Sequence, residues 1–131
     1  MITGLYASLL TLWFVLLSMR VIALRGNPLF AFLKLGASPD AMLERAVRAH
    51  GNFAEYVPIM LILVYLLETL PDVTVNPMTL HVLGGAFLIG RLMHGVCFGF
   101  LQSNMALRVG GTALTLFPLI AAALLLLVNV L

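Results

Sequence analysis

No charged side chain occurs between Val109 and Leu131, at the end of the chain. A helix needs about 20 apolar residues to cross the hydrocarbon core of a bilayer. Loops cannot face lipid there, because their backbone amide and carbonyl groups would be left without hydrogen-bond partners. This segment therefore predicts a membrane-spanning helix.

Three further apolar segments extend the prediction. The four spans are expected at about residues 5–24, 53–70, 78–100 and 109–131. Only 9% of the residues are charged, whereas soluble domains carry about a quarter. The seven Lys and Arg residues are too few and too dispersed for a nucleic-acid surface. The sequence predicts an all-α, four-transmembrane-helix bundle, formed by residues 1–131 as a single integral membrane domain among membrane lipids.

The second span is expected to extend beyond the membrane. Ser38 is a good helix N-cap, and Pro39 suits the first helical turn. The uncharged run between Glu55 and Glu68 is short for a span. One long helix from about residue 39 to about residue 70 is therefore predicted, with its polar first half outside the hydrocarbon.

Basic residues are distributed unevenly among the three connections. Those in or beside the first connection are Arg25, Lys34, Arg45 and Arg48, and the third contains Arg108. The second connection has Glu68 and Asp72 but no Lys or Arg. The positive-inside rule therefore predicts that the first and third connections are cytoplasmic and that both termini lie outside.

A stripe of polar side chains runs along the second helix toward the membrane. At about 100° per residue, an arc of roughly 100° contains these side chains: Arg45, Arg48, Asn52, Glu55 and Tyr56. His50 falls outside the arc. Ionisable groups at membrane depth are costly, so they indicate a functional site with a partner.

Some of these residues also have ordinary structural explanations. Glu44 and Arg48 are spaced for an ion pair on the helix surface. Tyr56 would fit the aromatic belt at a membrane interface. His94, in the third span, could form a polar bridge to Arg91 or to a backbone carbonyl.

Counting charges at the cytoplasmic ends of the second and third spans gives a positive excess. The groups there are Arg45, Arg48 and Arg91 against Glu44 and Glu55, with His94 one turn from Arg91. Guanidinium groups suit carboxylates or phosphates, and Glu55 would suit an ammonium group. A small zwitterion with more than one carboxylate meets both demands. Convincing metal-ligand spacing among His, Cys and carboxylate residues is absent from the sequence, so no metal is expected.

The stretch "ERAVRAHGNFAEYVP" resembles the second-helix signature of the MAPEG family, the membrane-associated proteins of eicosanoid and glutathione metabolism. In that family a run of the form R-A-x-x-N-x-x-E-Y-x-P marks the glutathione site. Its fixed positions are all present, as Arg48, Ala49, Asn52, Glu55, Tyr56 and Pro58. A third span that contains "GRLMHGVCFGF" also agrees, and the resemblance covers nearly the whole chain.

The resemblance implies a homotrimer that holds glutathione, as co-substrate, between neighbouring subunits at the cytoplasmic side of a bacterial inner membrane. The glutathione contacts that it implies are Arg48, Asn52, Glu55 and Tyr56, joined by Arg91 from the third helix. His50 stands where relatives often have glutamine or histidine, and it is counted with this group. Arg108 is a further candidate for it.

Catalysis would need more than binding, because the thiolate of glutathione is the nucleophile. The transferases of the family end their first helix in two successive arginines, whereas this chain has Arg25 followed by Gly26. Two tyrosines of the third helix are replaced by His94 and Phe98. The candidates for stabilising the thiolate are therefore Arg25, Arg91 and His94.

Three classes of function follow from these observations. The favoured one is a glutathione-dependent transferase or peroxidase that acts on a hydrophobic electrophile or hydroperoxide. A protein that binds glutathione or anionic lipid without chemistry is the alternative, because the second arginine is missing. A small transporter is disfavoured, since the chain shows neither an internal repeat nor a pair of broken helices.

Overall fold

The structure is a computed structural model, and it describes residues 1–35, 39–102 and 104–131. Every element of the described chain is helical. In chain order they are α1 (Ile2–Leu24), the short 3-10 helix η1 (Pro28–Leu33), α2 (Pro39–Thr69), α3 (Pro77–Gly99) and α4 (Met105–Val130). The all-α fold predicted from the sequence is confirmed.

All four α-helices are long and apolar enough to cross a membrane. Their outer faces expose large apolar side chains, among them Leu12, Ile62, Val82 and Phe117. A soluble monomer rarely presents so much apolar surface, whereas lipid chains cover it at no cost. The chain is a multi-pass integral membrane protein, as the sequence predicted.

Asparagine and proline set several of the helix ends. Asn27 accepts a hydrogen bond from the amide of Leu29 (2.9 Å) and Asn76 accepts one from Met78 (2.9 Å). Proline follows each of these asparagines at the first helical position, where it lacks only a donor that would be unpaired. Ser38, which the sequence predicts as the N-cap of α2, lies outside the described residues.

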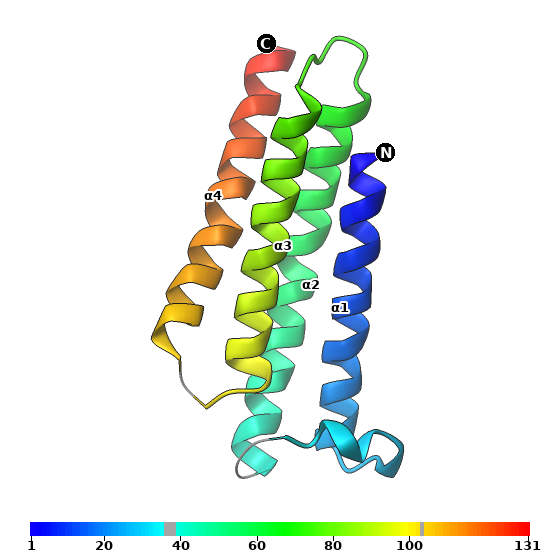
Figure 1. Ribbon diagram of the computed structural model, residues 1–131, viewed down its shortest axis with the longest axis vertical. Helices are drawn as coiled ribbons and strands as arrows, with labels where there is room; N and C mark the ends of the chain where they lie inside the picture. Colours follow the sequence, from blue (N-terminus) through cyan, green and yellow to red (C-terminus); the bar gives the residue numbers. More distant parts are fainter. Residues whose placement is uncertain (36–38, 103) are drawn as a thin grey trace.

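The helices form an open arrangement around α2 and α3. α1 packs on α2 and α3, and α4 packs on α3 and α2, but α1 and α4 make no contact in the described chain. Figure 1 shows both termini and the α2–α3 connection at one end, and η1 with the α3–α4 connection at the other. The polar first half of α2 therefore lies at the end that carries the first and third connections.

Glycines bring the backbones of α3 and α4 together. A Cβ atom at Gly90 would lie 2.6 Å from the carbonyl carbon of Leu114, and one at Gly111 would lie 2.8 Å from the amide of His94. Pro118, four residues after Leu114, has no amide hydrogen to donate to the Leu114 carbonyl, and that carbonyl packs against Gly90 instead. This close approach determines which side chains of α4 can reach α3.

At the other end of the bundle, Glu68 near the end of α2 holds the start of α1. Its carboxylate accepts hydrogen bonds from the amides of Ile2 and Thr3, and from the Thr3 hydroxyl at 2.6 Å. A carboxylate at a helix N-terminus pairs with free amide groups and with the positive end of the helix dipole. Glu68 thus joins the end of α2 to the start of α1. This contact lies at the opposite end of the bundle from the polar first half of α2.

Candidate functional site

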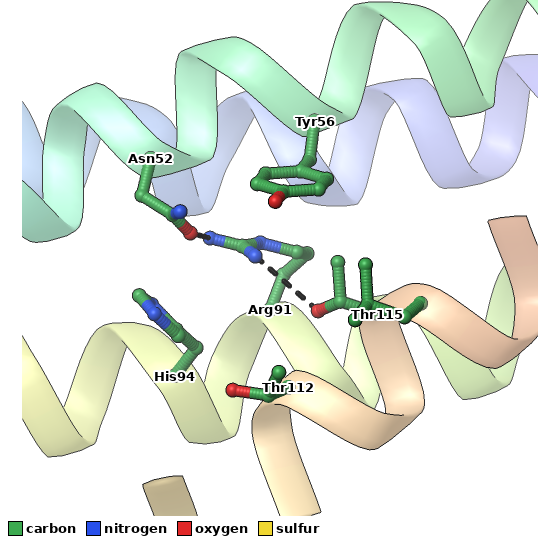
Figure 2. A pocket seen from close by; sticks show the side chains of 7 residues that line it. Asn52, Tyr56, Arg91, His94, Thr112 and Thr115 are labelled. Carbon is green, nitrogen blue, oxygen red and sulfur yellow. Dashed lines mark hydrogen bonds between the residues drawn. The ribbon is translucent and has the colours of Figure 1, made fainter. Parts of the chain in front are cut away.

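Arg91 lies at the centre of the site, with 1% of its surface exposed. Its Nη2 donates to Oδ1 of Asn52 at 2.7 Å, and its Nη1 donates to Oγ1 of Thr115 at 3.2 Å. Figure 2 shows the guanidinium group between these two side chains, so that it joins α3 to α2 and to α4. The Thr115 hydroxyl in turn donates to the carbonyl of Gly111 (2.7 Å), which leaves its oxygen free to accept from Arg91.

The charge of Arg91 is stabilised by aromatic rings rather than by a carboxylate. Its Cζ lies 5.6 Å from the ring centre of Phe53 and 5.7 Å from that of Tyr56. Among the described residues, the ion pair is between Glu44 and Arg48, and Arg91 takes no part in it. A buried charge without a counterion is costly, so this position suits a site that receives an anion.

A small cavity adjoins Arg91. It has a volume of about 40 Å³ and is lined by Asn52, Tyr56, Arg91, His94, Thr112, Thr115 and Leu116. This volume is enough for a water molecule, which needs about 10–15 Å³ measured in the same way, but it is far too small for a tripeptide.

A larger groove begins beside this cavity, and Asn52 and His94 line both. Its volume is about 430 Å³, within the range of about 300–1,000 Å³ that is usual for small-molecule sites. The groove is lined by Arg48, Gly51, Asn52, Glu55, His94, Phe98 and Arg108. Two arginines from different helices and one glutamate therefore face a single space.

Arg48 and Glu55 are both exposed in this groove. Arg48 also forms the i,i+4 ion pair with Glu44 that the sequence predicted, with Nη2 and Oε1 3.3 Å apart. This pair is on the surface, with both side chains more than 70% exposed, and such pairs contribute little to stability. Arg48 can therefore exchange Glu44 for a bound anion at small cost.

His94 stacks on Phe98, with the ring centres 4.5 Å apart. Its Nδ1 is buried and has no hydrogen-bond partner among the described residues. The polar bridge from His94 to Arg91, considered as an alternative from the sequence, is not among the hydrogen bonds of the described chain. Arg108 lies on the same aromatic ring, with its Cζ 5.8 Å from the centre of Phe98.

Two predicted site residues lie on the α1 side of the chain and outside this groove. Nε2 of His50 is 2.9 Å from Oγ of Ser18, and its ring stacks on Phe14 at 4.5 Å. Ser18 donates its own hydrogen to the Phe14 carbonyl, so His50 is the donor in this contact. Arg25 is exposed at the end of α1. Within one chain, neither residue joins Arg48 or Arg91.

Sequence reasoning missed Thr115, the hydrogen-bond partner of Arg91 on α4, and Thr112, which lines the small cavity with it. Thr112 and Thr115 were a visible signal, because they stand three residues apart in an otherwise apolar run.

Arg20 interrupts the first span, and the sequence analysis gave it no role. It is fully buried, and its guanidinium donates to the carbonyls of Gly99 (3.0 Å), Leu33 and Leu35. Arg20 thereby ties η1 to the end of α3.

A second, apolar groove follows α4 away from Arg108. Its volume is about 560 Å³, and its lining residues are Arg108, Val109, Thr112, Ala113, Leu116, Phe117 and Ile120. Phe117 is 71% exposed and Ile120 is 53% exposed, so the groove is open along the outer face of the helix. Arg108 is common to this groove and to the polar one.

The sequence is similar to those of known membrane proteins, in agreement with the four-helix architecture. The sequence model of the MAPEG family matches residues 3–128. Two relatives, both described as inner membrane protein YecN, come from Escherichia coli strains K12 and O6:H1. Each is 33% identical over 115 residues, which cover 88% of this chain and 82% of the relative. No solved structure matches the chain. The family match spans all four helices and the polar groove between them, and the chain therefore belongs to the MAPEG family.

Proposed function

We propose that the chain binds glutathione in the polar groove between α2, α3 and α4. The observation that carries this proposal is the set of charges on the groove, where Arg48 and Arg108 face the same space as Glu55. Glutathione has two carboxylates and one ammonium group. The two arginines suit the carboxylates, because a guanidinium group can form paired hydrogen bonds with a carboxylate, and Glu55 suits the ammonium group.

We further propose that the complete site forms between subunits of a homotrimer. The groove is open, and Arg25 and His50 lie on the α1 side of the chain, away from it. If neighbouring subunits hold glutathione between them, the α1 side of one subunit can face the groove of the next. Arg25 and His50 would then reach the ligand held by the neighbour's Arg48 and Glu55.

The activity that we propose is a glutathione-dependent transferase or peroxidase reaction. In a transferase the thiolate bonds to an electrophilic carbon while the leaving group departs. In a peroxidase two glutathione molecules become a disulfide while a hydroperoxide is reduced to an alcohol and water. Arg91, whose charge has no carboxylate partner in the described chain, stabilises the thiolate together with Arg25 and His94. The apolar groove along α4 suits a hydrophobic acceptor, because Arg108 connects it to the polar groove.

The relatives are described as inner membrane proteins, and we propose the same location for this chain, with the groove facing the cytoplasm. Cytoplasmic glutathione would then enter the groove directly. The uneven distribution of Lys and Arg supports this orientation.

The enzyme proposal is tested by measuring the pH at which the thiol of bound glutathione ionises. Arg91→Ala and Arg25→Ala should each raise the pH at which the absorbance of bound thiolate appears. Both should slow conjugation of an aryl halide by about 10²–10³-fold, the usual effect of losing a preorganised charge. Lys34→Ala removes an exposed cation at the same end of the molecule and should change neither quantity. If both arginine variants ionise glutathione fully, the assignment of these residues is wrong, and Arg108 is the next residue to test.

Glutathione binding without catalysis is the second candidate. It is favoured by Gly26 in the place of the second arginine and by the exposed position of Arg25. A wild-type protein that binds glutathione, forms no thiolate near neutral pH and turns over neither electrophile nor hydroperoxide would establish it in place of the enzyme.

A further inference from the structure

A second polar cleft adjoins the groove, and Phe98 and Arg108 line both. Its volume is about 50 Å³, and it is lined by Arg45, Cys97, Phe98, Gln102, Asn104, Met105 and Arg108. The Cζ of Arg45 lies 5.2 Å from the centre of the Phe98 ring, and that of Arg108 lies 5.8 Å from it. The guanidinium groups of Arg45, on α2, and Arg108, on α4, therefore both lie against the Phe98 ring.

The described residues around this cleft provide no negative charge. Its lining residues include no Asp or Glu. Glu44, the acidic neighbour of Arg45 in sequence, is paired with Arg48, and Glu55 lines the groove instead. Two guanidinium groups within reach of one ring, with no acid between them, attract an anion.

Arg45 also has an unused donor. Its Nη2 donates to the carbonyl of Cys97 at 3.0 Å, near the end of α3, but its buried Nε has no hydrogen-bond partner among the described residues. A buried donor without a partner costs free energy, and an oxygen of a bound anion would satisfy it. The amide group of Gln102, which is exposed at the cleft, offers another donor.

The position of the cleft favours a lipid over a dissolved anion. Arg108 lies in the first turn of α4, a helix that is apolar enough to cross the membrane, so we expect the cleft near the level of the phospholipid phosphates. Met105 lines it and is 69% exposed, and Val109, one turn further along α4, is 59% exposed. An anion bound here has apolar surface beside it that can contact the first carbons of an acyl chain.

We propose that this cleft binds the phosphate of an anionic phospholipid, with Arg45 and Arg108 as its cationic contacts. Basic pockets between transmembrane helices commonly bind acidic headgroups in this way. The inference goes beyond glutathione binding, because Arg45 lines this cleft and does not line the groove.

The experiment is native mass spectrometry of the detergent-purified protein, titrated with phosphatidylglycerol or with phosphatidylcholine of the same acyl chains. The wild type should prefer phosphatidylglycerol. Arg45→Gln should weaken phosphatidylglycerol binding by about tenfold or more, the usual effect of losing hydrogen bonds to a charged group, and should leave phosphatidylcholine binding unchanged. Lys34→Gln removes a cation elsewhere at the same end and should bind both lipids as the wild type does.

A second variant covers the case in which Arg45→Gln does not fold. Gln102→Glu changes an exposed side chain and places a negative charge at the cleft, so it should also weaken phosphatidylglycerol binding. Millimolar inorganic phosphate should not displace the lipid, and displacement would assign the cleft to free phosphate. Wild-type affinity for phosphatidylglycerol in folded Arg45→Gln or in Gln102→Glu, or no preference in the wild type, would overturn the proposal.

Discussion

Arg91 keeps its charge inside the membrane through two neutral acceptors, Asn52 and Thr115. Each acceptor comes from a different helix, so the arginine fixes the spacing of α2 and α4 around α3. The same two bonds hold the guanidinium group still, and a fixed charge stabilises an anion without first having to reorganise. The structural role of Arg91 and the chemical role that we propose for it therefore coincide in one side chain.

Replacing Thr115 by valine should test the structural role of Arg91. Thr115→Val leaves Nη1 of Arg91 buried without an acceptor, and this should lower the free energy of unfolding by about 1–3 kcal/mol. Thermal unfolding in detergent measures the effect. Thr112→Val is the matched control, because the exposed Thr112 hydroxyl donates only to the Arg108 carbonyl of its own helix. Equal losses in the two variants would show that Thr115 contributes nothing specific to Arg91.

Arg48 should matter for the ligand and little for the fold. Arg48→Ala should weaken glutathione binding by about 1.5–3 kcal/mol, the range for hydrogen bonds to charged groups, which is roughly 10- to 150-fold in the dissociation constant. Titration calorimetry on the purified protein measures the dissociation constant and therefore the free energy of binding. Stability should hardly change, because the ion pair to Glu44 is exposed. Unchanged affinity would remove Arg48 from the proposed glutathione site.

The contact between α3 and α4 depends on the absence of a side chain at Gly90. Gly90→Ala should force α4 away from α3, because the new Cβ would lie 2.6–2.8 Å from atoms of Leu114, and overpacking of this kind costs about 1–3 kcal/mol. Gly51→Ala is the control in another helix, where a Cβ meets no atom within 4 Å. Thermal unfolding should show a lower midpoint for Gly90→Ala and no decrease for Gly51→Ala. A wild-type midpoint for Gly90→Ala would mean that the two helices separate easily.

The distribution of charge predicts how the whole bundle lies in the membrane. In a Cys97→Ser background, Lys34→Cys places a thiol in the first connection and Thr74→Cys places one in the second. Both positions are exposed. An impermeant thiol reagent added to intact cells should label residue 74 and leave residue 34 unlabelled, since the first connection is predicted to be cytoplasmic. The opposite pattern would put the groove on the wrong side for cytoplasmic glutathione.

Hydropathy and helix periodicity were enough to predict the four helices and the polar face of α2. They even placed His50 off the stripe of Arg48 and Glu55, because the angle between residues of one helix is fixed by the sequence. How one helix faces another is not fixed in this way. Much of α4 is apolar all round, so its sequence could not tell that Thr115 turns toward Arg91 while Phe117 faces outward. The stack of Arg45 and His94 on Phe98 depends on the same rotations.

The apolar groove along α4 opens toward lipid rather than toward water. In the proposed reaction, a hydrophobic acceptor would therefore dissolve in the bilayer before it reaches Arg108 and the thiol of glutathione. Its rate of use would follow its mole fraction among the lipids rather than its molarity in the buffer. Adding empty vesicles to a reconstituted sample would then dilute the acceptor and slow the reaction, although the amounts of protein and acceptor stay the same. Glutathione would saturate the protein as before, because it arrives from the aqueous side.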